Sequence, residues 1–110
     1  SKHPSSQRFH AWDGKNTVQV RDYVSAIDNP KRRAMVESVI RTFETEILTS
    51  GVGDKFRTGI NQGDFNDANI LVDGELQLSG VIDFGDSTES WRILDLSVGM
   101  AYSLLTTYGK

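Results

Sequence analysis

Residues 60–72 read INQGDFNDANILV and residues 79–86 read SGVIDFGD, and the expected architecture follows from these two stretches. Each joins polar residues to an apolar segment of the kind that forms β-strands. The first stretch places the carboxylate of Asp64 five residues before the carboxamide of Asn69. The second ends its apolar segment on Asp83. Oxygen-bearing side chains therefore lie at the ends of two predicted strands.

These side chains suit phosphoryl transfer. That reaction needs a base near the acceptor hydroxyl and hard oxygen ligands for Mg²⁺ near the phosphates, because positioning and charge neutralisation supply most of the catalysis. Each residue also has a structural interpretation when taken alone. Asp64 or Asp83 is also explained as a turn residue that accepts backbone hydrogen bonds, and Asn69 as one that ties its loop to itself.

Strand pairing would bring the two stretches together. If Ile70–Val72 pairs antiparallel with a strand that ends at Ile82, Asn69 and Asp83 come side by side. Two oxygen ligands from different strands could then share one metal ion. The sequence therefore predicts a hairpin with a candidate metal site at its open end.

The connection between the two strands must be long enough for this pairing. A two-residue turn at residues 73–74 would leave the two oxygen ligands about 16 Å apart along the strand. We therefore expect a looser connection over residues 73–78, either with Val72 near Ser79 or with a bulge at Gly80.

The two motifs resemble those of the aminoglycoside phosphotransferase-like family, which has a protein-kinase-like fold. Its catalytic loop reads His-Gly-Asp, four residues, Asn, and its metal aspartate begins an Asp-Phe-Gly-like step. The resemblance implies that Asp64 is the catalytic base and that Asn69 and Asp83 bind Mg²⁺, with ATP or GTP as the phosphate donor. Gln62 stands where the family usually has His. Gln62 and Asp95 are implied to support the catalytic loop structurally.

The resemblance further implies a kinase that phosphorylates a hydroxyl of a small amine-bearing metabolite. Hydroxylysine is the first candidate acceptor, and aminoglycosides, choline, ethanolamine and homoserine are the alternatives. Acidic loops would suit such a cationic acceptor. The competing interpretation is a non-catalytic interaction or metal-binding module derived from a pseudokinase. Gln62 makes this interpretation conceivable, because an amide cannot titrate as His does.

Composition narrows the class of protein. With 110 residues the chain is one domain at most, and its formal charge of −3 argues against nucleic-acid binding. No apolar run approaches the length of a membrane span. The absence of Cys fits a cytoplasmic enzyme. We expect residues 1–8 to form a flexible tail and residues 9–110 to form part of a C-terminal lobe. The nucleotide-binding lobe would be absent, so the chain alone should be inactive.

Apolar periodicity predicts the remaining elements. A short helix is expected over residues 17–27, with Asn16 or Thr17 as its cap, and a longer helix from about Lys31 to Thr49. Residues 84–90 are polar and predict a loop, and the following residues predict a helix that runs towards Thr107.

The expected fold class is α+β, with helices packed around a small β-hairpin that carries the catalytic loop. The last helix has more apolar surface than a small chain can hide. We therefore expect neighbours that cover this apolar C-terminal helix, either later helices of the full enzyme or, by self-association, another copy of the chain.

Overall fold

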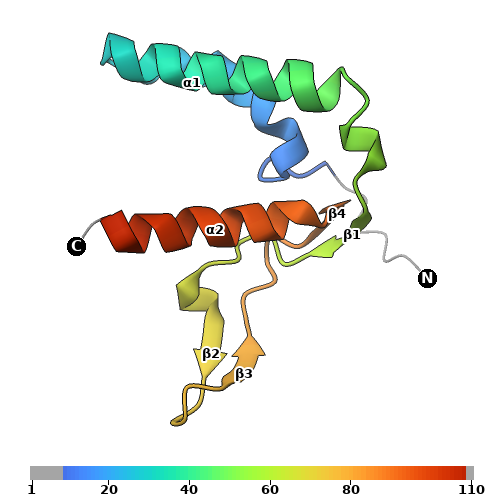
Figure 1. The fold of residues 1–110 in the computed structure, drawn as a ribbon, viewed down its shortest axis with the longest axis vertical. Coiled ribbons are helices and arrows are strands. Elements are labelled where there is room, and N and C mark those ends of the chain that lie inside the picture. The colour runs from blue at the N-terminus through green and yellow to red at the C-terminus, as the bar shows by residue number, and fades with distance from the viewer. Residues whose placement is uncertain (1–8, 109–110) are drawn as a thin grey trace. The chain divides into compact units, whose positions relative to one another are not determined.

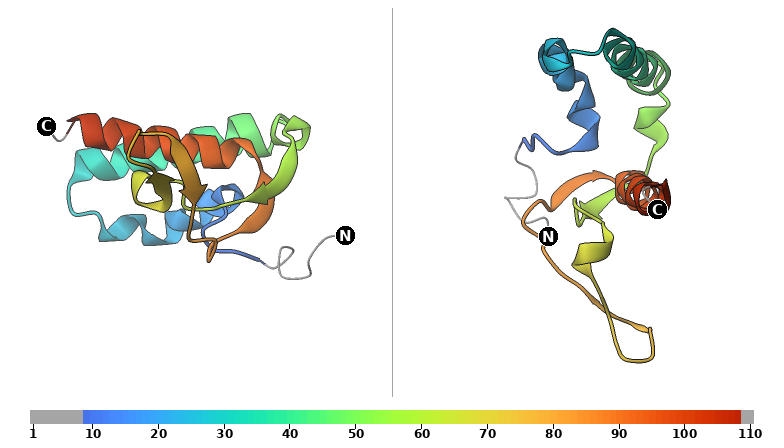
Figure 2. Two further views of the ribbon diagram at one scale, coloured as in Figure 1. Left: turned by 90° about the horizontal axis from the view of Figure 1, so that it is seen from below. Right: turned by 90° about the vertical axis from the view of Figure 1, so that its left-hand side faces the viewer.

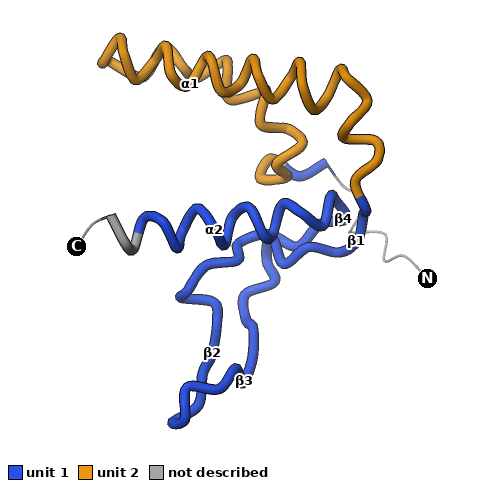
Figure 3. Tube along the Cα trace, in the orientation of Figure 1, with its two compact units in different colours: residues 1–10, 57–110 blue, residues 11–56 orange. Residues whose placement is uncertain are grey.

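The computed structural model describes the backbone of residues 9–108 and the side chains of residues 9–105 (Figure 1). The tail expected over residues 1–8 lies outside the described residues. The chain divides into two compact units (Figure 3). One unit comprises residues 11–56, and the other contains residues 57–110 together with the segment before residue 11. Both stretches that carry the predicted site belong to this second unit.

The fold class is α+β, as the sequence predicts. In its described part, the second unit contains two two-stranded antiparallel sheets and one long helix. β1 (Thr58–Asn61) pairs with β4 (Thr88–Trp91), and β2 (Ile70–Val72) pairs with β3 (Leu78–Val81). α2 (Ile93–Tyr108) follows β4. The β2–β3 hairpin projects away from α2 (Figures 1 and 2).

The first helix of the other unit differs from the prediction in its start and its type. It is a 3₁₀ helix, Gly14–Ala26, and not a helix over residues 17–27. Its cap is Asp13, whose carboxylate accepts a hydrogen bond from the Lys15 N–H at 3.1 Å. An Asp accepts this bond as well as an Asn or a Thr does, so the aspartate that comes earlier in the chain starts the helix.

α1 (Pro30–Phe43) forms where the periodicity predicts it, and a π-helix, Glu44–Leu48, continues it. The Asn29 side chain accepts hydrogen bonds from the N–H groups of residues 31 and 32 at 3.0 and 3.1 Å. Pro30 suits the first turn because an N–H at this position would have no intrahelical acceptor, so its absence in proline costs nothing. Arg21 donates to Glu44 at 2.7 Å, and this hydrogen bond, followed by the Arg21 charge, lowers the pKa of Glu44.

The β1–β4 sheet replaces part of the loop expected over residues 84–90. In β4, Thr88 and Ser90 are buried with 6% and 1% of their surface exposed, and Trp91 is buried with 8% exposed. Because mostly polar residues fill the buried positions, the segment lacks the apolar alternation that marks a strand. The Asn61 side chain of β1 donates to the Trp91 carbonyl at 2.8 Å, which satisfies a buried polar pair.

The β2–β3 hairpin has the loose connection that the sequence requires. Ile70 lies opposite Val81 and Leu71 lies opposite Gly80, but Val72 lies opposite Leu78. One extra residue, Ser79, is therefore accommodated in β3. The irregularity lies one residue from the bulge predicted at Gly80. The pairs Ile70–Val81 and Leu71–Gly80 keep a regular register, and this register places Asn69 near Asp83.

Asp73 organises the connection between these two strands. Its carboxylate accepts hydrogen bonds from the backbone N–H groups of Glu75 and Gln77, each at 2.9 Å. The Asp73 N–H also donates to the Gln77 carbonyl at 2.9 Å. The longer loop leaves backbone N–H groups without partners in the sheet, and the Asp73 carboxylate accepts hydrogen bonds from two of them. The strands are therefore joined by this loop and not by a two-residue turn at residues 73–74.

Apolar side chains along α2 are exposed, including Leu96, Met100, Leu104 and Leu105. Among the described helices, none has the length and apolar character to cross a membrane. The self-association expected through this helix stays a prediction.

Substitution of Asn29 by Ala should remove the cap of α1. We expect the free energy of unfolding to fall by about 1 kcal/mol, because two backbone N–H groups lose their acceptor. Asn29→Asp is the matched control, since a carboxylate keeps the acceptor and interacts favourably with the helix dipole. Urea unfolding followed by circular dichroism measures both variants. Equal stability of the Ala and Asp variants would contradict the capping role.

Candidate functional site

The buried side-chain amide of Gln62 joins the two motifs. Its Oε1 accepts a hydrogen bond from the Asp64 N–H at 2.7 Å. Its Nε2 donates to the carbonyls of Ile82 and Asp83 at 3.0 and 2.7 Å. Only 6% of the Gln62 surface is exposed. One side chain therefore fixes the position of the loop that carries Asp64 relative to the strand end that carries Asp83.

Asp95, in the first turn of α2, holds the backbone of the same loop. Its Oδ2 accepts from the Gln62 N–H at 2.7 Å and its Oδ1 accepts from the Gly63 N–H at 3.0 Å. Hydrogen bonds to a carboxylate are roughly twice as strong as those between neutral groups. Phe65 lies against α2 so closely that a Cβ added at Gly99 would come 2.9 Å from its Cδ1. The loop is thus anchored to α2 by both charge and packing.

Gly63 makes a sharp bend in this loop. Its φ is +94°, in the left-handed region that glycine adopts without steric cost. A Cβ at this position would overlap the carbonyl group of Asp86. Close approach of residues 63 and 86 therefore depends on the missing side chain. Sequence reasoning assigned Gly63 no role, because a glycine inside a motif does not reveal which backbone passes beside it.

The carboxylate of Asp64 is held by amide donors on both oxygens. Asn66 Nδ2 donates to Oδ1 at 2.9 Å and Asn69 Nδ2 donates to Oδ2 at 3.2 Å. Asn69 Nδ2 also donates to the Asp64 carbonyl at 2.9 Å. Asn66 was not among the predicted site residues. The available signal was its place two residues after an aspartate, from which a short amide side chain can bond backwards to the chain.

Asn69 and Asp83 come from neighbouring ends of β2 and β3, as the hairpin geometry predicts. The Asn69 carbonyl accepts from the Ile82 N–H at 3.0 Å, so Asp83 is the next residue beyond that pair. Asn69 is buried, with 7% of its surface exposed. Asp83 is exposed, and its backbone has a φ of +61°. From the described residues, the carboxylate of Asp83 accepts one long hydrogen bond, from the Gly85 N–H at 3.4 Å.

The donor set of these two residues fits Mg²⁺. Asn69 uses its Nδ2 on Asp64, which leaves its carbonyl oxygen, Oδ1, available as a metal ligand. The exposed Asp83 carboxylate supplies further hard oxygens. Among the described residues, no three His, Asp or Glu side chains gather into a metal-ligand group. Mg²⁺ is commonly bound through one or two protein ligands, with waters and substrate phosphates completing the octahedron, so a pair is sufficient.

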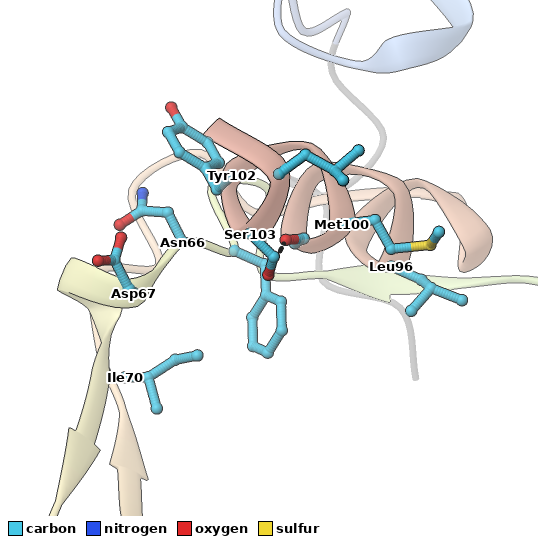
Figure 4. Close-up of a pocket in the computed structure, with 10 residues that line it drawn as sticks. Asn66, Asp67, Ile70, Leu96, Met100, Tyr102 and Ser103 are labelled. Carbon is cyan, nitrogen blue, oxygen red and sulfur yellow. Dashed lines mark hydrogen bonds between the residues drawn. The ribbon is translucent and has the colours of Figure 1, made fainter. Parts of the chain in front are cut away.

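A groove of about 580 Å³ lies between the Asp64 loop and α2. Figure 4 shows Asn66 and Asp67 on one side of it and Met100 and Leu96 on the other. The walls also include Phe65, Ile70, Gly99, Tyr102, Ser103 and Leu104. The size suits a small molecule, and polar side chains line the groove from both the loop and α2.

Comparison with known proteins identifies the family. The model of the phosphotransferase enzyme family matches residues 2–108. The chain belongs to this family. The hydroxylysine kinase of Mus musculus is 35% identical over 115 residues, covering 94% of this chain and 30% of the relative. The hydroxylysine kinases of Bos taurus and Xenopus laevis are 30% and 32% identical, with the same coverage. No solved structure matches the chain.

The chain therefore spans about a third of the length of the curated phosphotransferase relatives it matches, 30% in each of these three cases. The part of this chain that is matched includes both motifs, because the alignment covers 94% of the chain. The Gln62 amide and the Asp95 carboxylate thus belong to a region shared with phosphotransferases.

Replacing Gln62 with Leu, a side chain of similar volume, should destabilise the unit that contains the site. The Asp64 N–H and the carbonyls of Ile82 and Asp83 would lose their shared partner. We expect the free energy of unfolding to fall by about 2 kcal/mol or more, since each buried unsatisfied group costs roughly 1–3 kcal/mol. Urea unfolding followed by tryptophan fluorescence tests this. Gln62→His, which retains one donor, should lose less, and a Leu variant as stable as wild type would refute the role.

Gly63→Ala should also destabilise the protein, by about 2 kcal/mol or more. The new Cβ would meet the Asp86 carbonyl and would also strain a left-handed backbone. Gly74→Ala is the matched control, because nothing lies within 4 Å of a Cβ built there. Thermal unfolding of the two variants side by side provides the measurement. Equal losses at the two positions would show that the close approach does not matter.

Proposed function

We propose that the whole protein containing this chain is a Mg²⁺-dependent phosphotransferase. It would transfer the γ-phosphate of ATP or GTP to a hydroxyl of a small amine-bearing metabolite. The observation that carries the proposal is the Gln62 amide, which hydrogen-bonds to both the Asp64 loop and the Asp83 backbone. A base and a metal ligand held in one frame are what phosphoryl transfer requires of its protein.

Asp64 would act on the acceptor. In the reaction the hydroxyl oxygen forms a bond to the γ-phosphorus while the bond to the nucleoside diphosphate breaks, and the hydroxyl proton passes to the Asp64 carboxylate. Because little of this proton has moved in a loose transition state, holding the hydroxyl in line matters as much as basicity. The two amide donors on the carboxylate would supply that fixed orientation.

Asn69 Oδ1 and the Asp83 carboxylate would hold the metal ion. When bound, Mg²⁺ would neutralise charge on the phosphates. Asn69 would have a second role, because its Nδ2 donates to Asp64 while its oxygen would bind the metal ion. Gln62 and Asp95 would keep these groups in place without touching the reactants.

The acceptor class is proposed from two observations. The matched relatives are hydroxylysine kinases, and the exposed Asp67 lines the groove between the loop and α2. A carboxylate at that place would favour a cationic amine. Hydroxylysine is the first candidate, with aminoglycosides, choline, ethanolamine and homoserine as alternatives.

We propose that residues 9–110 form part of the C-terminal lobe of a protein-kinase-like fold and act in the cytoplasm. The relatives are more than three times as long as the matched region, so the nucleotide-binding groups would come from the rest of the whole protein. The chain by itself should then show no turnover. A measured kinase rate from these residues alone would contradict that expectation.

The alternative function is a non-catalytic interaction or metal-binding module derived from a pseudokinase. The observation in its favour is Gln62 at a position where the family usually has His. The three hydrogen bonds of Gln62 weaken this alternative, because they show the amide holding the loop, which requires no titratable group. An activity measurement on the whole protein distinguishes the phosphotransferase from the non-catalytic module.

The test is nucleotide consumption by the whole protein over a panel of amino-alcohol metabolites that includes hydroxylysine. We expect Mg²⁺-dependent turnover on one amine and a loss of at least about 100-fold in Asp64→Asn, the range typical of a missing general base. Asp83→Ala should abolish turnover. Asp28→Ala, an exposed carboxylate of the other unit, is the matched control and should retain full activity. A folded protein without turnover on any acceptor would favour the non-catalytic alternative.

A further inference from the structure

We propose that Asn66 is a positioning residue that fixes the orientation of the Asp64 carboxylate for proton acceptance. The inference rests on the proposed phosphotransferase function and assigns a role to a residue that neither motif singled out. Asn66 would act through Asp64 and would not bind the metal ion.

Both ends of the Asn66 amide are engaged. Its Oδ1 accepts a hydrogen bond from the Ala68 N–H at 2.9 Å and caps the short 3₁₀ turn Asp67–Asn69. Its Nδ2 donates to Asp64 Oδ1 at 2.9 Å and to the Asp64 carbonyl at 3.1 Å. The backbone N–H of Asn66 also donates to that carbonyl, at 2.9 Å. The side chain is therefore immobilised by the turn at one end and meets the base at the other.

The carboxylate needs such a donor because its last torsion is soft. Rotation about χ2 of an aspartate is broad and roughly two-fold, so packing alone does not select one orientation. Asn66 holds Oδ1 and Asn69 holds Oδ2, and the two donors approach from different residues of the loop. Each oxygen keeps a further lone pair for a substrate hydroxyl. The carboxylate plane is thereby set before the acceptor arrives.

The turn alone does not explain an asparagine at position 66. Ser and Asp side chains accept the same hydrogen bond from a backbone N–H two residues ahead. An ionised Asp has no donor, and Ser has its donor and acceptor on one short oxygen, whereas the amide carries them on two separate atoms, and here the nitrogen donates to Asp64. The capping role therefore explains the oxygen of Asn66 but not the hydrogen bond from its nitrogen to the Asp64 carboxylate.

Asn66 also allows the positioning effect to be separated from the metal. Asn69 would serve the metal and the base together, so its replacement would disturb both. Asn66 donates to the base, and its oxygen accepts from the Ala68 N–H and is not one of the two proposed metal ligands. It does line the groove beside α2, so direct contact with the acceptor is the competing role to be tested (Figure 4).

The experiment compares Asn66→Asp and Asn66→Ser with wild type in the whole protein. Both variants keep the acceptor for the Ala68 N–H, Asp lacks the donor, and Ser is too short to reach both partners. We expect kcat to fall by about 10- to 100-fold in each, as misplacement of a reacting group typically costs. The KM values for acceptor and nucleotide, the Mg²⁺ concentration for half-maximal rate and the melting temperature should stay close to wild type. Asn69→Ser should differ by raising the Mg²⁺ requirement.

Three outcomes would overturn the inference. Unchanged kcat in both variants would show that the donor is dispensable. A raised acceptor KM with unchanged kcat would make Asn66 a substrate-binding residue, and a lowered melting temperature in both would make it a structural one. If wild type turns over no acceptor, the proposed function fails together with the inference. An active wild type with insensitive Asn66 variants removes the inference alone.

Discussion

The site depends on one buried amide. Gln62 has a donor and an acceptor on the same rigid group, so it can bind the Asp64 N–H on one side and the carbonyls at the end of β3 on the other. A carboxylate or an aliphatic chain in its place would satisfy only one of these partners or neither. The Asp95 carboxylate accepts a hydrogen bond from the Gln62 N–H, which fixes the Gln62 backbone to α2. Gln62 therefore connects α2, the loop that carries Asp64 and the end of β3.

This dependence on hydrogen bonds follows from the small apolar core of the unit. In the described part of residues 57–110, Trp91 is the one buried large apolar residue, whereas Asn61, Gln62, Asn69, Thr88 and Ser90 are buried polar residues. Each intramolecular hydrogen bond adds only about 1 kcal/mol net, but leaving a buried partner unsatisfied costs more. The network therefore specifies one arrangement of the loop more strongly than it stabilises the unit.

The same network explains how structural and chemical roles coincide in single residues. Asn69 ties its loop to Asp64 with its nitrogen and keeps its oxygen for a metal ligand role. Asn66 closes a turn with its oxygen and reaches the proposed base with its nitrogen. Two-ended amides are suited to a site in which a carboxylate must stay oriented yet accessible, because each holds a neighbour without adding charge.

Local sequence patterns predict the α+β class, α1, α2 and the β2–β3 register at the open end of the hairpin. These follow from apolar periodicity, from Pro30, and from the spacing that Asn69 and Asp83 must satisfy, all of which are local. Only the folded structure reveals β4 and the approach of Gly63 to Asp86. A strand of mostly polar residues has no apolar alternation to reveal it, and its burial depends on β1, which lies 27 residues earlier at its nearest paired position. Contacts between residues far apart in the chain leave no periodic signal, so only the folded backbone defines them.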